Sequence, residues 1–129
     1  MKKILASISI LFLTSTMFAS ELTAVAKVDN KTKTLKTFKS KLIKFSATES
    51  KNSNGNNRYL VYRWIDKKGA ILSKNKVFVN KYDKRGMYEV TLKVTDIRNL
   101  QTASDKISIY VEMDELQVSN YQNKQNKTL

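Results

Sequence analysis

The stretch YDKRGMYEVTLKVTD, residues 82–96, decides the fold class of this chain. After Gly86, apolar and polar residues alternate strictly. One face carries Tyr88, Val90, Leu92 and Val94. A period of two in β-branched and aromatic residues indicates a half-buried antiparallel strand. The stretch therefore predicts an all-β domain, with Gly86 in a turn that needs a positive φ.

Shorter segments on both sides carry the same signal. Further strands are expected at 21–28, 43–47, 60–64, 70–73, 77–79 and 106–112, the last with Ile107, Ile109 and Val111 facing inward. The segment 29–41 is rich in lysine and threonine, and we expect an irregular edge or a strand that changes sheets. About seven short strands with turn signals between them predict an antiparallel β-sandwich. Its expected core includes Phe45, Tyr62, Trp64, Tyr88, Val90, Leu92 and Val94.

The chain divides into three regions. Residues 1–20 combine a basic start, Lys2 and Lys3, with an apolar run at 4–13, and this layout predicts a signal peptide cleaved after Ala19 or Ser20. An uncleaved N-terminal anchor is the alternative. The sandwich is expected over 21–112, and the polar stretch 113–129 predicts a disordered tail. We therefore expect a mature protein without a transmembrane segment, exported to the periplasm, the cell surface or the medium.

Composition narrows the possible chemistry. The chain has 129 residues and contains neither cysteine nor histidine. Their absence excludes thiol nucleophiles, imidazole bases, disulfides and the usual zinc sites. No cofactor and no metal are expected.

The charge is strongly basic. The chain has 24 Lys and Arg residues against 11 Asp and Glu, a net charge of +13, which becomes +11 without residues 1–20. Such a charge predicts attraction to polyanions. However, only four of the basic residues are arginine, the residue suited to reading phosphates and base edges, so sequence-specific nucleic-acid binding is not expected.

The densest lysine cluster has no acidic residue within it. Its members are Lys31, Lys33, Lys36, Lys39, Lys41 and Lys44. On an extended strand, Lys39 and Lys41 share a side, as do Lys36 and Lys44 unless a bulge intervenes. These four are the candidate contacts for a polyanion such as lipopolysaccharide, acidic glycan or nucleic acid. The alternative is a solvated edge that is protected against aggregation.

Several spaced residues resemble the PKD family, the immunoglobulin-like repeats first described in polycystins. Ile43-Lys44-Phe45-Ser46-Ala47 is similar to an early strand of the family, and Tyr62-Arg63-Trp64 to its Tyr-x-Trp strand. The family's longest motif matches Tyr82, Gly86, Tyr88, Val90, Leu92, Val94 and Asp96. The resemblance spans residues 22–112 and implies a PKD-type sandwich.

The chain departs from the family at two places. Ile65-Asp66-Lys67-Lys68-Gly69 follows Trp64 in place of the usual Asp-Phe-Gly-Asp-Gly turn, and Arg85 stands where proline commonly precedes the glycine. The first change removes acidic groups that might have joined a cation site. Family members are spacers and protein- or glycan-contacting modules, so the resemblance implies binding or architecture rather than catalysis, and it transfers no site.

Other candidate sites have simpler structural explanations. Tyr62 and Trp64 might form an exposed aromatic platform, but their spacing favours the core. The tyrosines at 59, 110 and 121 are better placed for surface stacking, although each stands alone. The loop 49–57 resembles a diluted calcium loop with one carboxylate, and turn formation explains its asparagines better. Asp96 is expected to cap the following turn with its side chain.

An enzyme is not expected. A Ser–Lys dyad, or the carboxylates of Glu112, Asp114 and Glu115, would be the only catalytic candidates, and the carboxylates fall in or beside the predicted tail. The sequence thus favours a non-catalytic module that binds a protein or glycan partner. A nonspecific polyanion binder and a structural spacer are the alternatives.

Overall fold

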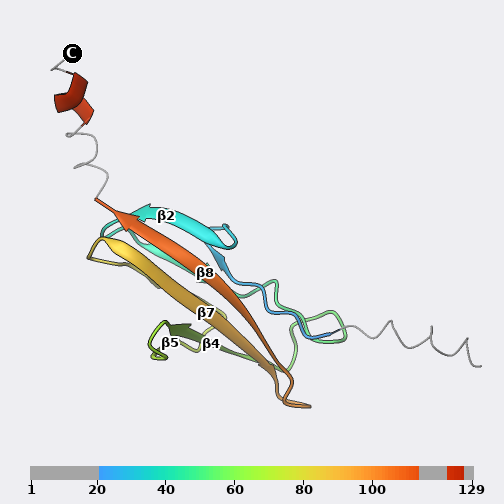
Figure 1. Ribbon diagram of the computed structural model, residues 1–129. Coiled ribbons are helices and arrows are strands. Elements are labelled where there is room, and N and C mark those ends of the chain that lie inside the picture. Colours follow the sequence, from blue (N-terminus) through green and yellow to red (C-terminus); the bar gives the residue numbers. More distant parts are fainter. Residues whose placement is uncertain (1–20, 114–121, 127–129) are drawn as a thin grey trace, which may run out of the picture.

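The structure is a β-sandwich of two sheets (Figure 1). This computed structural model describes residues 21–113 and 122–126. Within them the strands are β1 (Lys27–Val28), β2 (Thr34–Phe38), β3 (Ile43–Ser46), β4 (Leu60–Asp66), β5 (Ile71–Ser73), β6 (Val77–Asn80), β7 (Gly86–Asp96) and β8 (Thr102–Glu112). The smaller sheet has the order β1-β3-β6 and the larger has β2-β8-β7-β4-β5. The predicted all-β sandwich is confirmed.

The two ends of the chain are described only in part. The predicted signal peptide, residues 1–20, and most of the predicted tail lie outside the described residues. Within the tail, residues 122–126 form one helical turn.

Strand β7 is the centre of the larger sheet and comprises residues 86–96 of the alternating stretch 82–96. It pairs with β8 along residues 86–95 and with β4 along residues 90–96. Val90, Leu92 and Val94 are buried, whereas Tyr88 is only half-buried. The β4 pairing stops where Asp66 lies opposite Val90, so no β4 residue stands beside Tyr88.

The chain crosses from the smaller sheet to the larger one between β1 and β2. Three residues of this crossing have positive φ: Asp29 (48°), Asn30 (64°) and Lys33 (70°). Beyond it, β2 runs parallel to β8, and this is the exception to the antiparallel pairing predicted from the sequence. After the crossing, β2 forms the edge of the larger sheet beside β8, and the chain runs in the same direction through both strands.

The chain returns to the smaller sheet between β2 and β3, and this return corrects the expectation that Lys36 and Lys44 share a side. Lys36 lies on β2 of the larger sheet, and Lys44 lies on β3 of the smaller one. Both are exposed, and in a sandwich the outward faces of the two sheets point in opposite directions. The alternation of sides holds within each strand, but β2 and β3 belong to different sheets.

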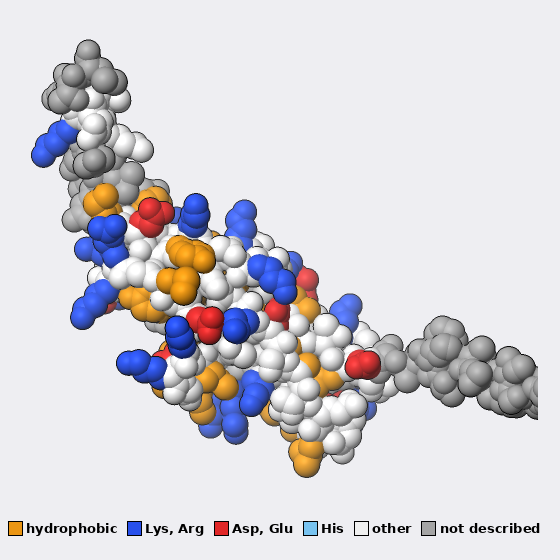
Figure 2. All heavy atoms as spheres, viewed as in Figure 1, with side chains coloured by type: hydrophobic (Ala, Val, Ile, Leu, Met, Phe, Trp, Pro, Cys, Tyr) orange, Lys and Arg blue, Asp and Glu red, His pale blue; other side chains and the backbone are white. Residues whose placement is uncertain are grey.

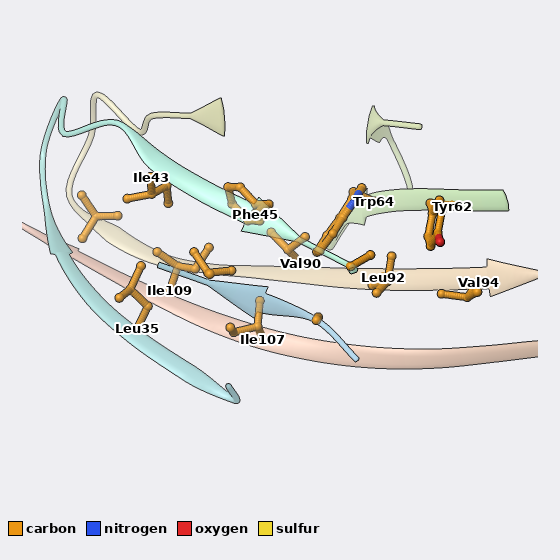
Figure 3. Close-up of a cluster of buried hydrophobic side chains, with 14 residues drawn as sticks. Leu35, Ile43, Phe45, Tyr62, Trp64, Val90, Leu92, Val94, Ile107 and Ile109 are labelled. Carbon is orange, nitrogen blue, oxygen red and sulfur yellow. The ribbon is translucent and has the colours of Figure 1, made fainter. Parts of the chain in front are cut away.

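The core is built around one aromatic cluster between the sheets (Figure 3). The ring of Trp64 on β4 lies 5.6 Å from that of Phe45 on β3 and 5.5 Å from that of Phe78 on β6, and the two phenylalanines stack at 4.5 Å. The indole Nε1 donates a hydrogen bond to the Asn75 carbonyl at 2.9 Å. Trp64 and Tyr62 therefore belong to the core, because both side chains are buried.

Replacing Trp64 with alanine removes the side chain that contacts β3 and β6, two of the three strands of the smaller sheet. We expect a loss of about 3–5 kcal/mol in the free energy of unfolding, measured by urea denaturation, because a large cavity would remain. The matched control is Val61→Ala on the same strand, where the side chain is exposed and a loss under about 0.5 kcal/mol is expected. Equal losses for the two variants would contradict a core centred on Trp64.

Candidate functional site

Two loops that are distant in sequence meet at one end of the sandwich. The turn between β2 and β3 contacts the connection between β6 and β7 through Ser40, whose backbone N–H donates to the Tyr82 carbonyl at 2.8 Å. The Ser40 hydroxyl also donates to Asp83 Oδ1 at 3.0 Å. These bonds hold the two loops side by side.

The contact gathers basic side chains from both loops. We call this region the basic end; it comprises Lys36, Lys39, Lys41, Lys81, Lys84 and Arg85. Among the residues that the structure describes, two acidic ones lie with them: Asp83, whose carboxylate is 3.9 Å from Lys81 Nζ, and Glu112 at the end of β8. Figure 2 shows Lys and Arg side chains standing around the end of the sandwich where β8 finishes, with hydrophobic side chains exposed between them. Positive charge therefore exceeds negative charge at this end.

A shallow depression lies on the basic end. Its volume is ≈ 420 Å³, and it is lined by Lys36, Arg85, Gly86, Tyr110, Val111 and Glu112. Tyr110 is 39% exposed and lies between Lys36 on β2 and Met87 on β7, because those three residues are cross-strand partners. Gly86, with a φ of 149°, sits where the loop that carries Arg85 enters β7. The depression thus combines one aromatic face with two cations and one carboxylate.

The four predicted polyanion contacts divide between this region and the opposite sheet. Lys36 lines the depression, and Lys39 and Lys41 lie on the adjacent turn. Lys44 lies elsewhere, opposite Val79 of β6. Sequence reasoning missed Lys81, Lys84 and Arg85, because only the Ser40 contacts show that their loop adjoins the first lysine cluster.

Of the other two tyrosines proposed for surface stacking, Tyr59 lies at the opposite end and Tyr121 is outside the described residues. The Tyr59 ring is already covered by the Arg98 guanidinium, which lies 4.8 Å from the ring centroid. Arg98 in turn forms a 2.8 Å ion pair with buried Asp96. Asp96 Oδ1 also accepts the Arg98 backbone N–H at 2.9 Å, so the expected side-chain cap of this turn is confirmed.

The asparagine-rich loop that resembles a calcium loop is organised by Asn52, which is buried. Its side-chain oxygen accepts the backbone N–H groups of Asn54 and Asn56, and its amide donates to the Asn56 side chain and the Arg58 carbonyl. The Asn52 and Asn56 side-chain oxygens are therefore engaged in turn bonds. Within residues 21–113 and 122–126, no three Asp or Glu side chains gather as metal ligands.

The catalytic candidates gain no geometric support. Glu112 is exposed on the rim of the shallow depression, while Asp114 and Glu115 lie outside the described residues. In the part of the chain that is described, no helix has the length and apolarity needed to cross a membrane.

Comparisons with known proteins find structures of similar fold, but they match the chain to no family. No protein-family model matches the chain, and no curated protein matches it either. A solved structure from work on "the promiscuous specificity of the carbohydrate-binding modules from the beta-sandwich super family" aligns with a TM-score of 0.54 and 22% identity. That alignment covers 74% of this chain and 36% of the other, so this chain spans about a third of its length.

A second solved structure, of fibronectin(III)-like modules of Clostridium thermocellum CbhA, aligns with a TM-score of 0.49 and 14% identity over 70% of this chain and 99% of the other. At these identities the similarities concern the fold. The first of them agrees with the β-sandwich fold of this chain.

The Asp96–Arg98 pair predicts a defined acid sensitivity. Hydrogen bonds from Arg98 hold the pKa of Asp96 below its usual value of 3.8. Since the folded-state pKa is depressed, the pair's contribution is complete above about pH 5 and is lost as the pH falls through the folded pKa. Replacing Arg98 with methionine should therefore flatten the fall in unfolding free energy between about pH 5 and pH 2, measured by urea denaturation.

The control is Arg63→Met, an exposed position on the outer face of β4. It should leave the acid dependence of the wild-type protein unchanged. An unaltered acid dependence in the Arg98 variant would show that the pair does not hold the Asp96 pKa down.

Proposed function

We propose that this protein is an exported, non-catalytic module of the PKD type that binds an anionic glycan at the basic end. The observation that carries the proposal is the depression, where the exposed Tyr110 ring is flanked by Lys36, Arg85 and Glu112. Export to the periplasm, the cell surface or the medium is supported by the basic and apolar character of residues 1–13.

The chemistry of the depression suits a sugar that carries an acidic group. An exposed aromatic ring packs against the C–H face of a pyranose, and its hydroxyl remains free to hydrogen-bond at the edge. A guanidinium pairs with a carboxylate or sulfate through two parallel N–H donors, and an ammonium adds a point charge. Glu112 would accept hydrogen bonds from sugar hydroxyls.

The shallow shape of the site also favours this ligand class. An open depression can contact a few units of a long polysaccharide while the remainder of the chain extends away, whereas small-molecule sites bury most of their ligand. The structural similarity to carbohydrate-binding modules supports the same conclusion at the level of fold.

A second candidate is nonspecific polyanion binding, favoured by the excess of positive charge at the basic end. In that case lysines contribute through the electrostatic field, and the aromatic ring contributes little. Affinity would then fall linearly with the logarithm of the salt concentration, with a slope set by the number of cations in contact.

The test is binding of the purified protein to neutral, carboxylated and sulfated polysaccharides, followed by calorimetry or affinity electrophoresis. We expect preference for an acidic polysaccharide. Tyr110→Ala should weaken this binding by about tenfold, and Arg85→Gln by about ten- to a hundredfold.

The matched control is Lys44→Ala, which removes the same charge as Lys36→Ala but from the opposite sheet. In the glycan model only the Lys36 variant weakens binding. If the two lysine variants weaken binding equally and Tyr110→Ala has no effect, the polyanion alternative is correct. If no polysaccharide binds, the spacer or protein-binding alternatives replace the proposal.

A further inference from the structure

The smaller sheet ends in an unpaired edge at β6. Among the described strands, β6 pairs with β3 alone. The Ala47 N–H donates to the Lys76 carbonyl at 2.9 Å, and bonded pairs alternate along an antiparallel ladder. The backbone N–H and C=O groups of Phe78 and Asn80 therefore form hydrogen bonds with β3. Those of Val77 and Val79 point away from β3, toward the open edge of the sheet.

This edge lacks the usual protection against strand addition. Its sequence, VFVN, contains no proline, glycine or charged residue. Val77 and Val79 are 37% and 56% exposed, respectively. Natural sheet edges are commonly blocked by lysine, proline or a bulge within the strand. The β6 edge is thus competent to pair with another extended chain.

An apolar cleft lies on the larger sheet, beside the segment that leaves β6. Its volume is ≈ 340 Å³, and its apolar walls come from Leu72 on β5, Tyr82 after β6, and Met87, Tyr88 and Val90 on β7. The Tyr82 and Tyr88 rings stack at 4.1 Å. The Tyr82 hydroxyl oxygen is buried without a hydrogen-bond partner among the described residues. Burial raises the pKa of Tyr82 to about 12, so the hydroxyl keeps its proton at neutral pH.

A strand added to β6 would lie close to the cleft, because the smaller sheet has fewer strands than the larger one. Phe78 of β6 contacts Trp64 of β4, so β6 lies over β4. In the larger sheet β5 continues beyond β4, and the three-stranded sheet has no strand above β5. A strand paired to the free side of β6 would cover β5. Alternate side chains of that strand would point toward Leu72 and the cleft, because side chains alternate between the two faces.

Charge indicates what the added strand would be. Lys67 and Lys68 line the cleft, Lys76 and Lys81 flank β6, and Lys44 lies opposite Val79 on the outer face. Asp66 and Glu89 also line the cleft, but Asp66 Oδ1 already accepts the Lys68 and Ala70 N–H groups, and Glu89 lies 3.6 Å from Lys106 Nζ. Lys81 Nζ lies 3.9 Å from Asp83, so four of the five lysines have no carboxylate within ion-pair distance among the described residues. If a second copy of this protein paired at the β6 edge, its lysines would lie close to those of the first copy, and each chain has a net charge of +13. Like-charge repulsion disfavours that arrangement, whereas a segment with acidic side chains would complement it.

We propose that the β6 edge and the adjoining cleft bind an extended segment of a partner protein in which apolar residues alternate with acidic ones. The backbone of the segment pairs with Val77 and Val79. Its apolar side chains enter the cleft beside Leu72, and its acidic side chains meet the surrounding lysines. Lys81 belongs to both this surface and the basic end, but no residue that lines this cleft also lines the depression proposed for the glycan, so the inference does not depend on glycan binding.

The probe is a fluorescent peptide of about eight residues that alternates valine and glutamate, added to the full protein and followed by anisotropy. Val79→Pro removes an N–H that points away from β3, so it should block pairing without disturbing the sheet. We expect it to weaken peptide binding at least about tenfold. Val79→Thr keeps the N–H and is the matched control, with affinity close to that of the wild type.

Two charge variants separate this surface from the basic end. Lys44→Glu should weaken peptide binding severalfold, whereas Lys36→Glu should leave it unchanged. If the two variants weaken binding equally, the peptide responds only to the overall positive charge of the protein, and the proposal is wrong. Equal affinity for a peptide of the same composition with its glutamates clustered at one end would overturn it as well.

Amide hydrogen exchange tests the pairing without any substitution. The Val79 amide should exchange rapidly in the free protein and become protected when the peptide is saturating, while the Phe78 amide is protected in both states. If the Val79 amide gains no protection, the peptide does not pair with this edge. If sedimentation shows a concentration-dependent dimer that Val79→Pro abolishes, the edge belongs to a second copy and the proposal is wrong.

Discussion

The contact between Trp64, Phe45 and Phe78 is the interaction on which the rest of the structure depends. It joins β4 of the larger sheet to β3 and β6 of the smaller one. The chain contains no cysteine, so no disulfide can link the sheets. Aromatic side chains bury more area than any other residue type, and one such cluster can hold two small sheets together. The positions of both ends of the sandwich follow from this central contact.

With the sheets fixed, short polar contacts organise the loops. At one end Ser40 joins two loops and gathers the basic residues, and at the other the Asp96–Arg98 pair supports Tyr59. The two ends therefore differ. Among the described residues, one end has an excess of cations around an accessible ring, whereas at the other end the arginine already covers the tyrosine ring. This difference in charge and accessibility favours the basic end as the proposed binding site.

Local patterns were sufficient to predict the strands and the inward faces. Strand β7, the turn at residues 66–69 and the inward set of β8 could be read from alternation and turn residues, because these depend on neighbours along the chain. The parallel pairing of β2, the separation of Lys36 from Lys44 and the approach of residues 81–85 to the first lysine cluster could not be read. Each depends on which sheet a segment joins, and that choice is made by packing between strands distant in sequence.

The parallel pairing of β2 with β8 has a mechanical consequence. The described chain enters at one end of the sandwich, and β8 finishes at the other (Figure 1). Tension applied between these points first loads β1 and its pairing with β3. Once β1 is released, β2 is pulled from its first residue and β8 from its last, so their five paired positions are loaded in shear. Sheared hydrogen bonds must break together, whereas those of an unzipping hairpin break one at a time. The β2–β8 pairing therefore resists tension along the long axis of the sandwich better than a hairpin of the same length would.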